Sequence, residues 1–549
     1  MVLAQTSAQP SVVVPDVAWS AFAPELLVVA VALVLLLVPI ARGRQQLVAL
    51  PSAALFLAVG VWLVTQQLLL PGAVVIAVGV ALPAAVFAFP RRVSMVQAVG
   101  AVAALLGALA LTGWQYVAVL AQEAGTLVPQ EALAGALAND GITFFTRITV
   151  YLAALLVIPL GYAYLNERKI NRAEVEPLLL FAAVGMVALA TANDMVTLFV
   201  ALEVFSLALY VLSGLARRDR RSQEAGLKYF VMGAVASAIL LYGMALLYVA
   251  TGHLDLPGMG TALALVTTDR FVAALGLGLV TVGIGFKVSL VPFMLWTPDV
   301  YQGAPTNITA FMAAATKAAA FAAVLRLYLV AFPGLQTLWV PVLAVLAAAS
   351  MLYGAYLAVV QRDLKRMLAY SAITHAGYAT IGVVAVSDQG LSATLFYLLA
   401  YAVSTLGALG CVVAVERTRR GEVGLVDLRG LGKTSPAIAG ILSLSLLSLA
   451  GIPPTAGFVG KLLVFRAGLD AGLTWLVVIG VLSTVVAAFF YLRIAGTMFL
   501  EEPDPEHAIP AQSTGMSLAI AVAAALVVFL GIQPQPILQL AEAAAALVR

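Results

Sequence analysis

The chain contains the run Gly283-Ile284-Gly285-Phe286-Lys287-Val288-Ser289-Leu290-Val291-Pro292, in which a lysine and a proline interrupt an otherwise apolar stretch. A charge at the centre of a membrane-spanning helix costs about 3 kcal/mol to insert, and a proline removes a backbone hydrogen-bond donor. A second run, Gly451-Ile452-Pro453-Pro454-Thr455, breaks another apolar stretch shortly before Lys461. Because these residues oppose insertion of the helices, we expect the chain to use them for a function inside the membrane.

The composition is that of an all-α polytopic membrane protein. Of 549 residues, 63% are hydrophobic and 10% are charged, and the mean hydropathy is +1.06. Soluble domains carry about 25% charged residues. The formal net charge is only +3 and no basic run alternates with aromatic residues, so we expect the lipid bilayer and not nucleic acid as a partner.

The cysteine and histidine content argues against a bound metal or redox cofactor. Cys411 is the only cysteine, and a lone thiol can neither ligate an iron–sulfur cluster nor form a disulfide within the chain. His253, His375 and His507 lie far apart in sequence. We therefore expect no metal site and no cofactor in this chain.

About sixteen apolar runs have the length of roughly 20 residues that is typical of a spanning helix. They cover residues 24–41, 46–65, 71–90, 96–120, 143–165, 175–192, 194–215, 226–250, 271–300, 306–330, 337–360, 367–387, 391–415, 436–465, 472–498 and 514–533. The segment from Met1 to Glu25 contains no Lys or Arg. It therefore lacks the basic start of a cleaved signal peptide, and we expect the first helix to be retained.

Basic residues gather on one side of the predicted helices. With the N-terminus outside, the cytoplasmic connections hold about nineteen of the 29 Lys and Arg residues: Arg42, Arg44, Arg91, Arg92, Arg168, Lys169, Arg172, Arg217, Arg218, Arg220, Arg221, Arg362, Lys365, Arg366, Arg417, Arg419, Arg420, Arg429 and Lys433. Because basic connections stay in the cytoplasm, we expect both termini to lie outside it. We also expect Arg326, Arg466 and Arg493 to reach the membrane interface from helix ends.

The two breaks, at Pro292 and at Pro453-Pro454, lie about 160 residues apart and indicate an internal repeat. A unit of five helices is odd, so the second unit enters the membrane from the opposite side, as in transporters that place ion sites near the membrane centre. A simple proline kink is the alternative for either break. The predicted divisions are 1–140 (about four helices), 141–174 (one helix), 175–335 (first repeat), 336–500 (second, inverted repeat) and 501–549 (last helix and tail).

Four charges lie inside the predicted helices: Glu203, Lys287, Lys317 and Lys461. A desolvated carboxylate at mid-helix, such as Glu203, is neutralised or seeks a cation. A lysine whose distance to a carboxylate varies can take up and release a proton, and this role is open to Lys287. The alternatives are an interhelical hydrogen bond for Glu203 and a fixed ion pair for Lys287.

Lys317 and Lys461 extend this pattern. Small residues flank Lys317 and leave room for water, so we expect a proton relay there; the alternative is a lysine that reaches the interface. Lys461 follows the second break as Lys287 precedes the first. Their placement on opposite sides of the prolines suits one uptake half-channel and one exit half-channel.

Three further residues are weaker candidates. Glu224 and Lys228 are spaced i to i+4 and share a helix face at its cytoplasmic start, where they form either an interfacial ion pair or part of a proton uptake route. His375 lies in an apolar run. Histidine titrates nearest to neutrality, so His375 is either a member of a polar axis through the second repeat or a satisfied core residue.

The run from Phe286 to Thr306 resembles the antiporter-like subunits of respiratory complex I, and its Asp299-Val300-Tyr301-Gln302-Gly303-Ala304-Pro305 segment is similar to subunit N of bacterial NADH:quinone oxidoreductase. The resemblance covers about residues 143–540. Further matching runs are Leu202-Glu203 with Ser206-Leu207, Lys228-Tyr229-Phe230, Ala315-Thr316-Lys317, Tyr370-Ser371 with His375-Ala376-Gly377-Tyr378, and the run from Leu449 to Lys461.

The resemblance implies a proton-translocating module of the bacterial inner membrane, bound laterally to other membrane subunits. Quinone reduction in distant subunits would drive it, with NADH, FMN, iron–sulfur clusters and quinone held by those partners. By position in the matching motifs, Glu203 and Lys287 resemble the family's coupling pair, Lys317 its connecting lysine and Lys461 its exit-side lysine.

Two departures from the family pattern stand out. Met294 occupies a position where the family often carries histidine. Two of the first four predicted helices look like an N-terminal addition, for docking or for contact with lipid.

We therefore expect a proton-translocating, non-redox subunit of type I NADH:quinone oxidoreductase. The alternative is a subunit of a multisubunit sodium/proton antiporter or a membrane-bound hydrogenase, against which the Val300-Tyr301-Gln302-Gly303 form argues. A passive scaffold that holds other subunits is a rival of another class.

Overall fold

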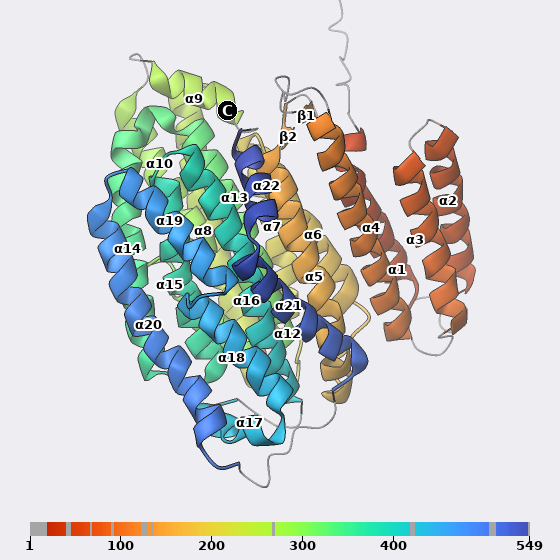
Figure 1. The fold of residues 1–549 in the computed structure, drawn as a ribbon. Coiled ribbons are helices and arrows are strands. Elements are labelled where there is room, and N and C mark those ends of the chain that lie inside the picture. Colours follow the sequence, from red (N-terminus) through yellow and green to blue (C-terminus); the bar gives the residue numbers. More distant parts are fainter. Residues whose placement is uncertain are drawn as a thin grey trace, which may run out of the picture.

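A computed structural model describes residues 19–39, 46–65, 69–88, 93–121, 130–132, 135–265, 269–417, 423–503 and 512–546 of the chain. Ten of the described helices are long and apolar enough to cross a membrane, and five shorter apolar helices accompany them. The helical membrane class is confirmed, and the helices stand side by side in one bundle (Figure 1). The count of sixteen spans stays a prediction.

The elements up to the first break are η1 (Trp19–Phe22), α1 (Ala23–Leu37), α2 (Gln46–Thr65), α3 (Leu69–Ala88), α4 (Val93–Ala121), β1 (Gln130–Ala132), β2 (Leu137–Asn139), α5 (Gly141–Glu167), α6 (Val175–Thr191), α7 (Met195–Ser213), α8 (Arg220–Thr251), α9 (Leu256–Ala264) and α10 (Arg270–Val288). The hairpin β1–β2 and the short helix α9 were not expected. Both lie at the same end of the bundle (Figure 1).

The remaining elements are α11 (Trp296–Gly303), α12 (Thr306–Phe311), η2 (Met312–Thr316), α13 (Lys317–Arg326), η3 (Leu327–Ala331), η4 (Pro333–Leu335), α14 (Gln336–Val360), α15 (Leu364–Val384), α16 (Asp388–Glu416), η5 (Leu425–Leu428), α17 (Leu431–Thr434), α18 (Pro436–Ala450), α19 (Ala456–Asp470), α20 (Thr474–Leu500), α21 (Thr514–Ile532) and α22 (Gln535–Ala546). The turns η2 and η3 are π-helical.

Both predicted helix breaks are confirmed. Helix α10 ends at Val288 and is capped by Ser289 in the left-handed conformation, with φ of 64°. Helix α18 ends at Ala450 and is capped by Gly451, with φ of 84°. The Val291–Pro292 and Pro453–Pro454 peptide bonds are cis. The repeat boundaries drawn from these breaks stay predictions.

The centre of the bundle is formed by α16 and by the continuous segment from α12 to η3. The most apolar stretch of each of these two segments is completely buried. Helices α8, α14 and α20 lie at the periphery and expose large apolar side chains such as Leu227, Val345 and Val485. An apolar perimeter is what lipid contact requires.

The first four helices divide into two pairs. Helices α1 and α4 pack on each other and on α6 and α5, whereas α2 and α3 pack on each other and join the rest mainly through the contact of α3 with α4, at the edge of the bundle (Figure 1). A groove of about 610 Å³, lined by apolar side chains such as Leu26, Phe56 and Val75, separates this hairpin from α1. That two of the first four helices are an addition to the family stays a prediction.

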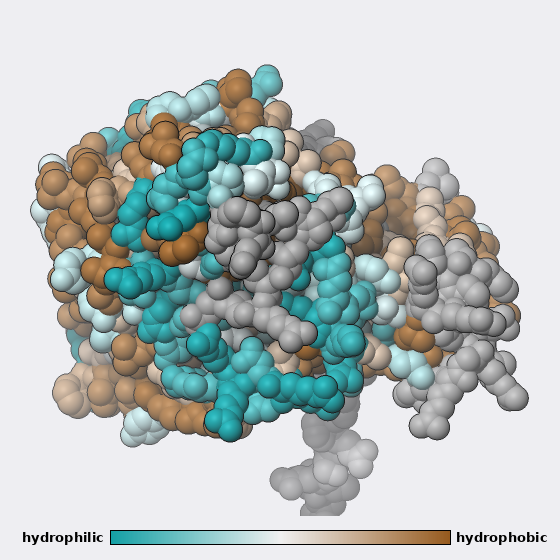
Figure 2. Space-filling view, turned by 90° about the horizontal axis from the view of Figure 1, so that it is seen from below, coloured by the Kyte–Doolittle hydropathy of each residue, from teal (hydrophilic) through white to brown (hydrophobic). Residues whose placement is uncertain are grey.

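The two ends of the bundle differ in charge. Seen from the end that carries α17, hydrophilic side chains gather in the middle of the face and hydrophobic ones around it (Figure 2). Arg168 and Arg417 form ion pairs with Glu416 and Glu167 at this end. Phe22 packs against Leu137 and Gly141 lies beside Ala544 at the opposite end, so both described ends of the chain share one side. Arg42, Arg44, Arg91, Arg92, Arg419, Arg420 and His507 lie outside the described residues.

Candidate functional site: a buried polar path

Lys287 lies in an aromatic cage at the end of α10. Its ammonium donates a hydrogen bond of 2.6 Å to Ser206 Oγ on α7. The rings of Phe205, Tyr229 and Tyr210 lie 4.9, 5.3 and 5.6 Å from Nζ. Aromatic faces attract a cation, and the carbonyl end of a helix does so too. The cage and the helix end together stabilise a charge that has no carboxylate in direct contact.

Glu203 lies one helical turn before Ser206 on α7. It is half-buried and accepts a short hydrogen bond from Ser237 Oγ on α8. Among the described side chains no ion pair joins Glu203 to Lys287, although the two interact electrostatically. Ser206 therefore contacts Lys287 and lies one helical turn from Glu203 on the same helix. The interhelical hydrogen bond considered for Glu203 is present, and the fixed ion pair considered for Lys287 is not.

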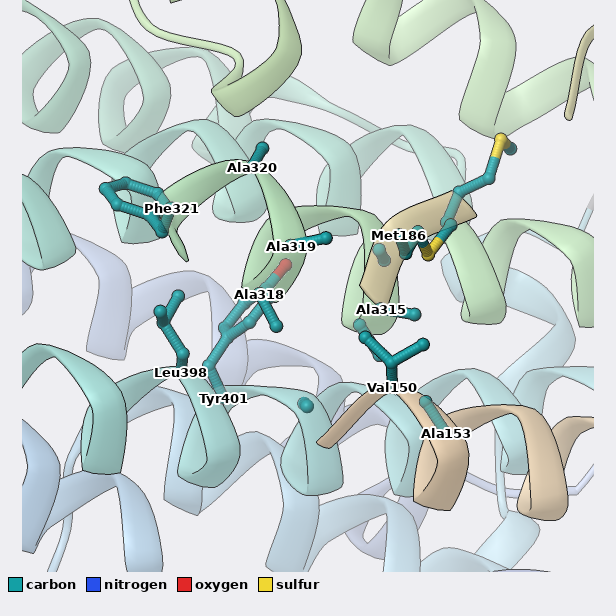
Figure 3. Close-up of a cluster of buried hydrophobic side chains, with 14 of the residues drawn as sticks. Val150, Ala153, Met186, Ala315, Ala318, Ala319, Ala320, Phe321, Leu398 and Tyr401 are labelled. Carbon is teal, nitrogen blue, oxygen red and sulfur yellow. The ribbon is translucent and has the colours of Figure 1, made fainter. Parts of the chain in front are cut away.

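Lys317 begins α13, directly after the π-helical turn η2. Its ammonium donates to Ala372 O at 2.5 Å and to Val288 O at 3.5 Å, next to Lys287. The ring of Tyr401 lies 5.6 Å from Nζ, and Tyr401 points from α16 toward Ala318 and Ala319 (Figure 3). Lys317 is buried, so the alternative of a lysine at the interface is wrong.

His375 lies on α15, the helix that also supplies Ala372, and is buried among tyrosines. Nδ1 and Nε2 lie 2.5 Å from Tyr397 Oη and 3.3 Å from Tyr491 Oη. The rings of Tyr401 and Tyr378 are 4.9 and 5.5 Å from the imidazole. The Tyr401 ring lies beside both His375 and Lys317, so the histidine is one aromatic ring away from that lysine. Membership of a polar axis stays a prediction.

Lys461 lies one turn inside α19, after the second break. Its ammonium donates to Ala450 O, at the end of α18, at 3.0 Å and to Thr484 Oγ1 at 3.4 Å. Thr484 in turn donates to Tyr378 Oη at 3.0 Å, and the Tyr378 ring lies 4.6 Å from Nζ. Tyr378 therefore contacts both His375 and Lys461.

Glu224 and Lys228 lie apart from this path. They form the expected i to i+4 ion pair, at 2.6 Å. Lys228 also pairs with Asp299 on α11 at 2.9 Å, and Asp299 pairs with Arg366 on α15 at 2.7 Å. The sequence interpretation missed Asp299 and Arg366 because charges at helix ends are common. This ion-pair network ties α11, the helix after the first break, to α8 and α15.

The expectation that Arg326 reaches the membrane interface is wrong. Arg326 is buried, and its Nη1 and Nη2 donate to Asp140, the N-cap of α5, at 2.8 and 2.7 Å. Arg493 is half-buried and donates to the Gln361 carbonyl at 3.0 Å, and the exposed Arg466 lies 3.8 Å from Asp470. Burial favours a carboxylate partner over snorkelling at Arg326, because an unpaired buried charge is costly.

Two more buried charges were not predicted. Arg147 on α5 donates from Nε to Glu25 on α1 at 2.6 Å and from Nη1 to Gln115 on α4 at 3.0 Å. Glu416, the last residue of α16, pairs with Arg168 at 3.2 Å. An apolar run that ends in a charge gives no signal that the charge is buried, so only the packing of the helices reveals these sites.

Among the residues that the structure describes, no group of three His, Cys, Asp or Glu side chains could hold a metal ion. Cys411 is buried and free. Met294, which stands where the family often carries histidine, is buried beside the first break. The buried path is thus built from lysine, serine, threonine, histidine and tyrosine, which are proton donors and acceptors.

Comparison with known proteins identifies a family of membrane proteins that this chain matches. The family described as "NADH:quinone oxidoreductase/Mrp antiporter, TM" matches residues 192–487, which include all seven candidate proton-carrying residues. NADH-quinone oxidoreductase subunit N of Rhodococcus opacus is 52% identical over 380 residues, 68% of this chain and 70% of the relative. Subunit N of Mycobacterium tuberculosis is 50% identical over 396 residues, 70% of this chain and 74% of the relative.

Solved structures agree with these relatives. A chain of respiratory complex I from Thermus thermophilus with bound aureothin is 34% identical, with a TM-score of 0.69, and covers 85% of this chain and 98% of its own. A chain of the Mrp complex from Dietzia sp. shares the fold at 24% identity, with a TM-score of 0.72 over 96% of this chain and 97% of its own. The chain therefore belongs to the NADH-quinone oxidoreductase subunit N family, the antiporter-like membrane subunits of bacterial respiratory complex I.

Proposed function

We propose that this chain is the proton-translocating subunit of a bacterial type I NADH:quinone oxidoreductase, and that it moves protons along the buried polar path. Its partners are the other membrane subunits of the complex. The relatives' names place NADH and quinone chemistry in the whole enzyme. We infer that this chain binds no cofactor and is driven by redox chemistry in its partners.

The observation that supports this function best is the continuity of contacts across the bundle. Lys287 contacts Ser206, and Lys317 contacts the carbonyl of the next residue, 288. The Tyr401 ring lies beside both Lys317 and His375. The Tyr378 ring lies beside both His375 and Lys461. The path crosses from the first proline break to the second. A passive scaffold needs no such series of titratable groups.

The neutral partners of the lysines suit proton transfer. A lysine paired with a carboxylate keeps its proton, whereas one held by hydroxyls, carbonyls and rings loses it more readily when buried. In our proposal, movement of Glu203 toward or away from Lys287, through Ser206, controls whether Lys287 is protonated. Lys317 then passes the proton to His375, and Lys461 delivers it to the outer half-channel. Glu224 and Lys228 would guide uptake at the cytoplasmic end, with both termini outside.

The test is to replace Lys287 with Met in the assembled enzyme and to measure proton uptake per NADH oxidised in membrane vesicles. We expect K287M to lower this ratio, because the methionine fills the cage but carries no proton. The matched control is K433M, since Lys433 is exposed at a helix end and pairs with Glu502 at 2.7 Å. An unchanged ratio in K287M would contradict the role of Lys287.

The rival functions make different predictions. If the chain is a passive scaffold, an enzyme in which all four buried charges are neutralised assembles and pumps normally. If the chain is a subunit of a sodium/proton antiporter, the number of protons taken up per NADH oxidised would depend on the sodium concentration. About 50% identity to subunit N, against 24% to a chain of an Mrp complex, favours the complex I function.

A further inference from the structure

A polar cavity of about 70 Å³ lies at the α17 end of the bundle, away from the residues of the path. It runs from the exposed connection between α7 and α8, at Asp219 and Arg221, to the buried end of α16 at Glu416. A single water needs only about 15 Å³ of such space, so the cavity has room for several. It therefore offers water a route from the surface to a buried carboxylate.

The Glu416 carboxylate is buried and held by three side chains from two other elements. Tyr164 Oη donates to Oε1 at 3.2 Å and Arg168 Nη2 lies 3.2 Å from the same oxygen. Thr306 Oγ1, at the first residue of α12, donates a short hydrogen bond to Oε2. Lys365 lines the same cavity and donates to Ala304 O at 3.1 Å. Glu416 therefore contacts one cation, a phenol and a hydroxyl, and a second cation, Lys365, lines the same cavity.

Glu416 and Lys317 lie at the two ends of one helix–helix seam. Helix α16 packs along α12, η2 and α13. At one end Glu416 contacts Thr306, and at the other Tyr401 contacts Lys317. Tyr401 and Glu416 are fifteen residue steps apart on α16, or about 22 Å of helix, so the seam joins the cavity to the path.

The segment α12–η2, which packs on α16 on one side and on α5 on the other, carries polar atoms that protein partners do not satisfy. Asn307 Oδ1 and Thr316 Oγ1 are buried and have no hydrogen-bond partner in the described part of the chain. A buried polar atom without a partner costs about 1–3 kcal/mol, so each of these is a position where a water molecule would be stabilised. Thr316 is the last residue of the π-helical turn η2, and such turns are frequent at functional sites.

We propose that Glu416 is a second cytoplasmic proton-loading site of this chain, beside the uptake route at Glu224 and Lys228, and that protons pass from it along the α12–α16 seam to Lys317. A proton leaves a hydronium ion in the cavity and binds a Glu416 carboxylate oxygen, leaving water. It then moves through water molecules beside Asn307 and Thr316 to the neutral amine of Lys317, which becomes an ammonium ion while Glu416 becomes a carboxylate again. This inference rests on the proposed function. A purely structural anchor for α16 would need the Arg168 pair but neither the cavity nor the unsatisfied seam.

The test uses E416Q in the assembled enzyme in vesicles, with E167Q as the matched control. Glu167 lies at the same end and pairs with Arg417, but its side chain is 44% exposed and it does not line the cavity that Glu416 lines. We expect E416Q to slow proton uptake by roughly tenfold or more, against the ~100-fold typical of a lost proton-transfer group, since water can partly substitute. Formate, a small weak acid that fits the cavity, should restore uptake in E416Q. E167Q should behave as wild type.

Comparison with K287M in the same preparation separates this inference from the proposed function. Reduced uptake in K287M with normal uptake in E416Q overturns the loading site alone, whereas normal uptake in both overturns the proposed function. Slow uptake in E416Q that formate does not restore indicates a structural role and also overturns the loading site. If E416Q does not assemble, E416D replaces it: a shifted pH profile of uptake supports the loading site, and a wild-type profile contradicts it.

Discussion

At the scale of single residues, the buried cations fall into two classes according to their partners. Arg147 and Arg326 each bind a carboxylate directly, at 2.6 and 2.7 Å. Lys287, Lys317 and Lys461 instead bind hydroxyls, carbonyls and aromatic rings. Arginine does not lose its proton in proteins, whereas lysine does when buried. The arginines therefore hold helices together, and the lysines are left able to exchange protons.

The prediction at the scale of single residues concerns the substitution of His375. In H375Q the amide can still bond to Tyr397 but cannot carry a proton, so the link between Lys317 and Lys461 should fail. We expect proton uptake to fall by roughly tenfold or more, as for other lost proton-transfer groups. The measurement is the uptake rate in vesicles containing the assembled enzyme.

The matched control for this substitution is H253Q, because His253 is an exposed histidine in the connection between α8 and α9. It should pump at the wild-type rate. Normal pumping by H375Q would show that protons bypass the histidine ring.

The sequence predicted the residues of the path better than their contacts. A charge within an apolar run is conspicuous, so Glu203, Lys287, Lys317 and Lys461 could be found from their surroundings. Ser206 and Tyr378 could not, because a serine or tyrosine in a spanning helix is ordinary. Glu416 could not either, because a carboxylate at a helix end is normally solvated.

At the scale of elements, the last carbonyl of each broken helix accepts a hydrogen bond from a lysine, Val288 O from Lys317 and Ala450 O from Lys461. Gly451, in the left-handed conformation, turns the chain after α18 and lets Lys461 reach Ala450 O at 3.0 Å. Only a residue without a side chain fits here, since a Cβ at Gly451 would lie 2.8 Å from Lys461 Cδ. The break therefore fixes where the lysine can lie.

Gly451 and Gly472 provide a matched pair of substitutions. Both have positive φ, 84° and 76°, and an alanine in either place costs about 1–2 kcal/mol of strain. A Cβ at Gly472 meets no atom within 4 Å, so only G451A displaces Lys461. We expect similar losses of thermal stability in the two variants.

Proton uptake should then separate them. G451A should lower uptake per NADH because Lys461 moves away from Ala450 O and Thr484, and G472A should leave it unchanged. Equal uptake in the two variants would mean that the position of Lys461 does not matter.

Helix bounds were predictable because apolar runs begin and end sharply in a membrane protein. The run predicted at 46–65 coincides with α2, and the run at 514–533 differs from α21 by a single residue. The π-helical turn before Lys317 was not predicted, since its sequence, Met312–Thr316, has ordinary helical composition. Its wider geometry depends on packing against α16 and α5.

At the scale of the whole molecule, the α2–α3 hairpin is the part least joined to the path. It contacts α4 and, less extensively, α1, while α1 and α4 hold their own place through the Arg147 ion pair and Gln115. In lipid, an apolar face uncovered by its removal costs little, because acyl chains replace the lost side chains.

Deleting residues 41–91 should therefore leave the enzyme assembled and pumping. A short Gly/Ser linker can join α1 to α4, since Gln97 on α4 donates to Leu35 O on α1 at 3.0 Å and Val38 packs near Val96. The measurements are the amount of assembled enzyme in the membrane and its proton uptake. Loss of assembly would instead identify the hairpin as a docking surface for another subunit.

The most direct measurement of a single path through this chain compares K287M, K461M and the double variant in the assembled enzyme. Residues that act as one unit give effects that do not add. A single path predicts that each substitution alone lowers proton uptake per NADH, and that the double variant falls no further than the worse of the two. Wild-type uptake in either single variant, or additive losses in the double variant, would contradict one continuous path from Lys287 to Lys461.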